Sequence, residues 1–312
     1  MRRLFSKAWI WSFTAALGMW VIAVLVTHGH GAGAMLTSAL ALAVFMVIAG
    51  IGQMFVITLG PGNIDMSLAA NIGLASAVAM TVMNGEDHLA LLGLAAALGC
   101  GVLIGAANYL LIRLLRIPPI IATLSASFII QSIDISYGRG LQIKPPDGFA
   151  DLTNYQMLGM PLLALFTVAV TVFAGVMMHR TIYGRAVLAV GQNPRAARLA
   201  GFGVEKARFF TYCLSGLLGG LDGTLLAGYF RGANMDIGND YLLASITVVV
   251  LGGTSVSGGK PAVPGVWGAA LFLVLMLTVL DTLGAGPGLR MILSGAAIVG
   301  VITVAGGSRS QA

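Results

Sequence analysis

Residues 180–208 read RTIYGRAVLAVGQNPRAARLAGFGVEKAR and lie between two long apolar runs. The segment holds six of the 17 basic residues of the chain but a single acid, Glu205. Its basic residues are Arg180, Arg185, Arg195, Arg198, Lys206 and Arg208. Basic residues collect in the cytoplasmic loops of membrane proteins. We therefore expect residues 180–208 to form a cytoplasmic loop between two membrane spans.

The whole chain has the composition of a membrane protein. Hydrophobic residues make up 58% of it and charged residues 9%, whereas a soluble domain carries about 25% charged residues. A lipid bilayer can cover that much apolar surface, and spanning segments are then helical. We predict an all-α polytopic membrane protein, with one transmembrane domain over residues 1–312 and the 180–208 loop within it. The net charge of +6 follows from the loops, so no nucleic-acid partner is expected.

Ten apolar runs mark the predicted helices. They cover residues 9–27, 35–58, 66–83, 89–112, 119–137, 158–178, 209–230, 241–253, 263–282 and 288–306. The run at 241–253 is shorter than the roughly 20 residues that a crossing needs, so a half-helix or broken helix is expected there. Ten crossings with a cytoplasmic N-terminus put both termini inside. Thirteen Lys and Arg residues then lie inside, including Arg113 and the six of the 180–208 segment, which is a clear positive-inside bias. The four outside are Arg139, Lys144, Arg231 and Arg290, and Asp151 is among the acids on that side.

Two glycine-rich interruptions divide the apolar runs. The first, TLGPGNIDMS, covers residues 58–67, and the second, LGGTSVSGGK, covers residues 251–260. Each lies between apolar runs, and a long run follows each. Paired interruptions in the two halves of a transporter indicate an internal repeat. The pattern therefore suggests a repeat of two halves.

Polar residues in and near these interruptions are the candidates for a translocation path. They are Asn63, Asp65, Ser67, Thr123, Ser125, Thr254 and Ser255. A carboxylate at membrane depth is costly unless it is paired or wet, so Asp65 either lines a water-filled path or caps the following helix. Thr123 and Ser125 either face a path or bond to carbonyls of their own helix. The residue pattern leaves these alternatives open.

A short helix with clear end signals lies within the basic segment. Asn193 is a good N-cap, and Pro194 suits the first helical position. Gly201 is placed to close the helix, which predicts about two turns over Pro194–Ala200. A short rigid helix with small side chains either enters a groove on a cytoplasmic partner or is a plain surface helix. The residues expected at a partner contact are Gly191, Asn193, Pro194, Arg195, Ala196, Ala197, Arg198 and Gly201.

The sequence does not carry the residue sets of an enzyme or a metal site. Residues 253–260 fail the phosphate-loop pattern, because Thr254 stands where glycine is required and Pro261 follows the lysine. The four histidines are scattered, and Cys100 and Cys213 lie inside apolar runs, which is typical of buried thiols. We expect no catalytic residue, no metal site and no cofactor in this chain.

Five segments resemble the membrane permease subunit of bacterial ABC importers for ribose and related monosaccharides. They are residues 62–67 (GNIDMS), 117–124 (IPPIIATL), 183–186 (YGRA), 191–201 (GQNPRAARLAG) and 250–259 (VLGGTSVSGG). The resemblance runs from about residue 35 to 306. Asn63 stands where that family usually has glycine, and Tyr241-Leu-Leu-Ala244 does not contain the two acids usual there.

This resemblance implies an inner-membrane permease that imports a monosaccharide or a related small sugar or polyol. It implies a dimer with a second copy or a sister permease, two ATP-binding cassette subunits that bind ATP and Mg²⁺, and a periplasmic sugar-binding protein. The 193–201 helix would be the coupling helix that enters a cleft on the ATPase. Ala197→Arg is then expected to uncouple transport, because a large charge would not fit that cleft.

A secondary transporter is the alternative interpretation. It would use Asp222 or Asp65 as a proton or sodium site, which explains acids at membrane depth but not a docking helix. Neutralising Asp222 separates the two, because an ABC permease should keep ATP-driven transport and a proton-coupled carrier should lose uptake.

Overall fold

The computed structural model describes residues 8–29, 31–138, 144–234 and 236–286, together with residues 288, 289, 292, 293, 295 and 296. These residues form helices apart from one two-stranded hairpin, so the predicted all-α fold is confirmed. In chain order the elements are α2 (Ala8–Val26), α3 (Ala32–Thr58), α4 (Leu68–Met83), η1 (Asp87–Leu89), α5 (Ala90–Leu115), α6 (Pro119–Gly138), α7 (Asp147–Asn154), β1 (Gln156–Met157), β2 (Met160–Pro161), α8 (Leu162–Arg180), α9 (Ile182–Gln192), α10 (Pro194–Leu199), α11 (Val204–Tyr229), α12 (Tyr241–Leu251) and α13 (Val263–Thr282).

Seven of the described helices are long and apolar enough to cross a membrane: α2, α3, α5 with η1, α6, α8, α11 and α13. Two apolar helices beside the glycine-rich interruptions are shorter, with 16 residues in α4 and 11 in α12. At 1.5 Å per residue they are about 24 and 16 Å long, less than the ~30 Å hydrocarbon core. Nine predicted runs therefore fall on helices, and the tenth, 288–306, lies mostly outside the described residues.

Five short elements were not predicted as separate elements: η1, α7, β1, β2 and α9. The strands pair antiparallel, with Met157 opposite Met160. Helix α9 lies inside the basic segment, where Thr181 caps it by accepting a hydrogen bond from the Gly184 N–H at 3.1 Å. The 180–208 segment is therefore mostly helical rather than an open loop.

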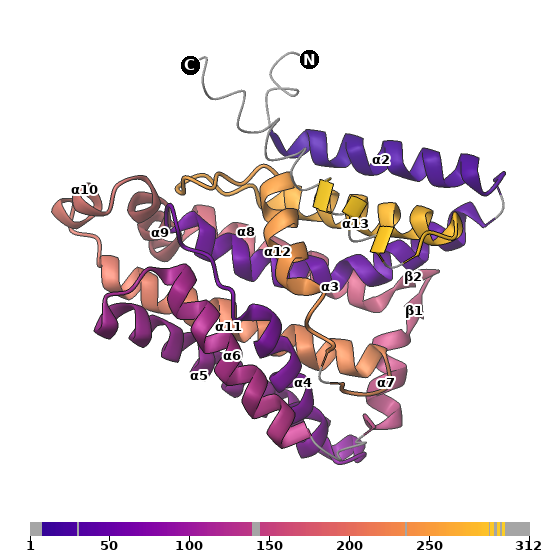
Figure 1. Cartoon of the computed structure of the whole chain (residues 1–312), viewed down its shortest axis with the longest axis horizontal. Helices are drawn as coiled ribbons and strands as arrows, with labels where there is room; N and C mark the ends of the chain where they lie inside the picture. Colours follow the sequence, from indigo (N-terminus) through magenta and orange to yellow (C-terminus); the bar gives the residue numbers. More distant parts are fainter. Residues whose placement is uncertain are drawn as a thin grey trace.

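Helix α3 is the centre of the molecule. Of the residues in its most apolar stretch, 83% are buried inside the molecule, against 17% in α2 and 33% in α8. Large side chains such as Phe45, Ile48 and Phe55 are fully enclosed, and α11, α12, α13 and α8 pack around them. Figure 1 shows α3 between α13 and α11, with α2 on the outside. Helices with broad exposed apolar faces are the ones that lipid can cover.

Helices α5 and α11 approach each other through glycines. A Cβ atom at Gly101 of α5 would collide with the carbonyl oxygen of Gly216 in α11, and the reverse substitution would collide with Gly101. A Cβ atom at Gly105 would likewise collide with the Tyr212 carbonyl oxygen, and one at Gly220 with the Ala97 carbonyl oxygen. Small residues at four-residue spacing let two helix backbones pack closely in a membrane. The α5–α11 pair therefore forms a tight unit beside α4.

The two ends of the molecule carry different elements. In Figure 1, α9 and α10 lie at one end, and α7 with the β1–β2 hairpin lies at the other. Asp151 and Arg231, both predicted to lie outside, form an ion pair of 2.7 Å at the α7 end. Arg113 and Arg198, both predicted inside, belong to one polar network at the α10 end. Charged residues predicted on the same side of the membrane therefore lie at the same end of the molecule. Which end faces the cytoplasm stays a prediction.

Candidate coupling and translocation site

The N-terminus of α10 has the cap that the sequence predicts. The Asn193 side-chain oxygen accepts hydrogen bonds from the N–H groups of Arg195 at 3.0 Å and Ala196 at 3.1 Å. Pro194 occupies the first helical turn, where its missing N–H leaves no bond unmade. The first N–H groups of α10 are therefore bonded to a side chain of the same segment, and the helix start needs no partner from elsewhere.

The C-terminus of α10 is closed just as locally. Gly201 has a φ of 85°, a conformation that glycine adopts without strain. The Phe202 N–H donates to the Ala197 carbonyl at 3.0 Å, and the Gly201 N–H donates to the Arg198 carbonyl at 3.1 Å. This pair of bonds is the Schellman motif. The predicted helix is thus confirmed, ending at Leu199, one residue earlier than expected.

The exposed surface of α10 differs from its predicted contact set. Ala197 is buried against the body of the protein, whereas Leu199 is 91% exposed. Arg195 and Ala196 are exposed beside it. Ala197→Arg would therefore disturb the packing of α10 on its own chain and does not isolate a partner contact. Leu199 was missed because the sequence pattern does not say which face of so short a helix packs inward.

Gly191, at the end of α9, lies where the two glycine-rich interruptions meet. A Cβ atom there would collide with the Thr58 carbonyl oxygen and with the backbone of Gly259. The Gly259 N–H donates a hydrogen bond of 2.9 Å to the same Thr58 oxygen. Residues 58–67, residues 251–260 and the α9 end are therefore in backbone contact. This convergence joins segments about 70 and 130 residues apart in sequence, which local patterns cannot reveal.

Asp65 lies within the first interruption and is enclosed in a polar network. One carboxylate oxygen accepts from the Ser67 N–H at 3.1 Å and the Ser67 hydroxyl at 2.7 Å. The other accepts from the Ser215 hydroxyl at 2.8 Å. The Asn108 amide donates to the Ser67 Oγ at 2.6 Å. Asp65 thus orders Ser67, the residue just before α4, and is itself buried. The predicted capping of α4 is not seen, because no side chain of the described residues accepts a hydrogen bond from the first N–H groups of that helix.

Thr123 and Ser125 lie on different faces of α6. The buried Thr123 hydroxyl lies 3.0 Å from the Ile64 carbonyl and accepts a 3.0 Å hydrogen bond from the Met66 N–H. Thr123 therefore holds the first interruption in place. Ser125 is exposed on the outer side of the helix, the only one of the two in a position to face solvent or a partner.

Thr254 and Ser255 are buried in the second interruption. The Thr254 hydroxyl accepts a hydrogen bond from the Ala262 N–H at 3.0 Å, and the Ser255 N–H donates to the Lys260 carbonyl at 3.0 Å. Both residues close a compact loop. Asn63, at the other interruption, accepts a 3.4 Å hydrogen bond from the Tyr212 hydroxyl and donates to the Gly60 carbonyl at 3.2 Å.

Other candidates stand apart from this region. Asp222 in α11 is fully buried, and neither carboxylate oxygen has a hydrogen-bond partner within the described residues. Over the same part of the chain, no cluster of His, Cys, Asp and Glu side chains suits a metal ion. The described residues place an exposed helix at one end of the molecule, and backbone contacts connect its segment with two interruptions within the bundle.

Comparison with known proteins shows similarity to transport permeases. Residues 35–302 match the family described as "Branched-chain amino acid transport system / permease component". The ribose import permease protein of Escherichia coli strain K12 is 31% identical, over 97% of this chain and 96% of that protein. The autoinducer 2 import system permease of Photorhabdus temperata is 32% identical, over 80% of this chain and 76% of that protein.

The ribose import permease of Bacillus subtilis is 32% identical, over 80% of this chain and 77% of that protein. No solved structure matches the chain. The family match covers most of the described helices, including both glycine-rich interruptions and α10. The chain therefore belongs to the family of multi-pass membrane permease components that includes the ribose import permeases.

Proposed function

We propose that this chain is the membrane permease of an ABC importer in the inner membrane. In this proposal separate ATP-binding subunits dock on α10, and a periplasmic binding protein delivers the substrate at the α7 end. The two termini and α10 face the cytoplasm, as the basic residues of the 180–208 segment favour. Two ATPase subunits serve a pair of permeases, formed with a second copy or a sister permease. ATP and Mg²⁺ bind to those subunits, so this chain contributes no ATP site.

The substrate proposed is a monosaccharide or a related small sugar or polyol. This rests on the similarity to the ribose import permease of Escherichia coli, which the alignment covers over 96% of its length. The wording of the family description, which names branched-chain amino acids, provides the competing substrate class. Identifying the ligand carried by the binding protein that co-purifies with this chain decides between them. A bound leucine, isoleucine or valine would contradict the sugar assignment.

The observation that carries the coupling proposal is the exposed Leu199 on a helix that is capped at both ends. A large apolar side chain at 91% exposure, outside the membrane-spanning segments, has no covering within the described chain. An isolated exposed leucine is unremarkable in itself, but this one is presented by a rigid helix beside basic residues. A groove on a cytoplasmic partner would bury it, in the helix-in-groove mode of recognition.

Leu199→Arg tests this contact. Burial of a leucine side chain contributes roughly 1.5–3 kcal/mol, so the variant should bind the ATPase at least about tenfold more weakly. The measurement is co-purification of ATPase with tagged permease in mild detergent, with the sugar uptake of the same cells. Leu158→Arg is the matched control for ATPase recovery alone, because Leu158 is 97% exposed at the α7 end, where the binding protein is proposed to dock. Equal ATPase recovery with Leu199→Arg and the wild-type chain would contradict the docking role of α10.

A further inference from the structure

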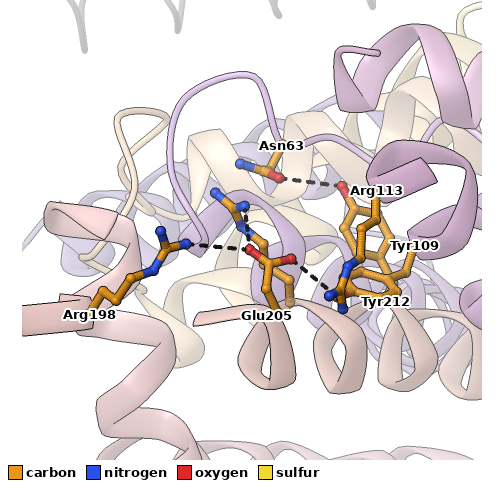
Figure 2. A network of polar contacts seen from close by, with 7 residues as sticks. Asn63, Tyr109, Arg113, Arg198, Glu205 and Tyr212 are labelled. Carbon is orange, nitrogen blue, oxygen red and sulfur yellow. Dashed lines mark hydrogen bonds and ion pairs between the residues drawn. The ribbon is translucent and has the colours of Figure 1, made fainter. Parts of the chain in front are cut away.

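Glu205 joins three helices at the α10 end of the molecule, as Figure 2 shows. Its carboxylate lies 3.8 Å from the Arg198 guanidinium of α10 and 3.2 Å from that of Arg208 in its own helix. It also accepts a hydrogen bond of 3.1 Å from the Tyr109 hydroxyl of α5. Glu205 is the one acid of the 180–208 segment, so no other carboxylate there can replace it.

Tyr109 is held firmly in this network. Its hydroxyl accepts a 2.9 Å hydrogen bond from Arg113, whose guanidinium lies 6.0 Å from the centre of the Tyr109 ring. The ring packs edge-on against Phe209 of α11 at 5.4 Å, and the whole side chain is buried. Contacts on several sides fix both the position and the direction of the hydroxyl. A displacement of Glu205 therefore acts on α5 through a side chain with little freedom to absorb it.

Asn108, the residue before Tyr109, contacts the first glycine-rich interruption. Its amide donates to the Ser67 hydroxyl at 2.6 Å, and Ser67 donates in turn to Asp65. Successive residues of a helix point about 100° apart, so this one turn of α5 faces both Glu205 and the Asp65 network. The close α5–α11 packing at Gly101 and Gly216 fixes the turn against α11.

The contacts differ in strength. The Arg198 side chain is 70% exposed, whereas those of Arg208 and Glu205 are about one-third exposed. Exposed ion pairs are weakened by solvent and salt, so the contacts with Tyr109 and Arg208 dominate. Helix α10 also acts on Glu205 through the chain itself, because α11 begins at Val204, only five residues after α10 ends at Leu199.

We propose that Glu205 is a positioning residue that transmits displacement of α10 through Tyr109 and Asn108 to the Asp65 network. The inference rests on the proposed docking of α10 to an ATPase. It assigns to the turn at residues 108–109 the role of connecting that docking site with the buried interruption. Removing the Glu205 charge, or the Tyr109 hydroxyl alone, should leave docking intact and lower the yield of transport from each ATP hydrolysed.

The test uses the complete importer, purified with its own ATPase and binding protein and reconstituted in liposomes. Sugar imported per ATP hydrolysed is compared for wild type, Glu205→Gln and Tyr109→Phe. We expect the ratio to fall about fivefold in Glu205→Gln, the lower end of typical coupling between sites, and to fall in the same direction in Tyr109→Phe. Glu205→Asp, which keeps the charge, should recover part of the loss. Lys206→Gln is the matched control, since it alters a neighbouring exposed charge outside the network.

The outcomes separate this inference from the proposed function. A wild-type ratio in both Glu205→Gln and Tyr109→Phe overturns the relay, while Leu199→Arg still reports on docking. Loss of ATPase recovery in Glu205→Gln and Tyr109→Phe overturns it too, because Glu205 would then only hold α10 for docking. Tyr109→Phe keeps the ring and its packing, so its result stands even if Glu205→Gln does not fold.

Discussion

The two glycine-rich interruptions lie at comparable places between apolar runs but are stabilised differently. The 58–67 interruption depends on side chains, with Asp65 accepting from two serines and Thr123 binding the backbone on either side. The 251–260 interruption depends mainly on its own backbone, with bonds such as Gly258 N–H to the Ser255 carbonyl at 2.9 Å. The first should therefore be sensitive to loss of a polar group, and the second to the addition of bulk.

The largest effect is expected at Asp65. In Asp65→Ala the donors of Ser67 and Ser215 lose their buried acceptor, and each unsatisfied group costs about 1–3 kcal/mol. We expect the free energy of unfolding to fall by about 3 kcal/mol or more, measured by denaturant titration in detergent. Asp151→Ala is the control, because the exposed Asp151–Arg231 pair contributes about 1 kcal/mol or less. Equal losses in the two variants would show that the Asp65 network is not what stabilises this interruption.

An intermediate effect is expected at Gly258. Its φ is 84°, and a Cβ atom would approach the Gly60 Cα to 2.4 Å. Gly258→Ala combines a left-handed backbone with a backbone clash, which should cost about 2–3 kcal/mol in stability by the same titration. Gly232→Ala introduces a methyl group where no atom lies within 4 Å, so it should leave stability nearly unchanged. If Gly258→Ala matched that control, the contact between the two interruptions would not be tight.

The smallest effect is expected at Asp222. Asp222 is as buried as Asp65 but has no hydrogen-bond partner among the described residues, so Asp222→Asn removes no contact. Because the amide is nearly the same size and shape as the carboxyl group, we expect little change in stability and unaltered ATP-driven uptake. The uptake assay also examines the alternative of a secondary transporter. Uptake abolished by Asp222→Asn, with normal expression, would favour a carrier driven by an ion gradient.

Features set by neighbouring residues were predictable from the sequence. The caps of α10 depend on Asn193, Pro194 and Gly201, which act within a few residues of one another. The positions of the long helices could be predicted because a bilayer covers long apolar runs of the sequence. The nine helices that match these runs follow from the same pattern.

Features set by distant contacts were not predictable. Asp65 and Ser215 are 150 residues apart, and only the packing of α11 against α4 brings them together. The orientation of α10, which buries Ala197 and exposes Leu199, depends on how α9 and α11 flank it. Thr123 was a candidate for the translocation path, yet its hydroxyl forms hydrogen bonds with the Ile64 carbonyl and the Met66 N–H. Polar residues in a membrane protein satisfy the backbone first, and sequence alone does not reveal which backbone groups need them.

The two caps of α10 have a consequence for the thermodynamics of association. Fixing one residue in a single backbone conformation costs about 1–2 kcal/mol of entropy, a cost that a disordered docking segment incurs each time it binds. Residues 193–202 are already ordered when the protein folds, because the N–H and carbonyl groups at both ends of α10 are bonded within the segment. A partner therefore meets a surface of fixed shape, and association does not incur the further entropy cost of ordering this segment. Loosening either cap, for example with Asn193→Ala, would therefore weaken binding although Leu199 itself is unchanged.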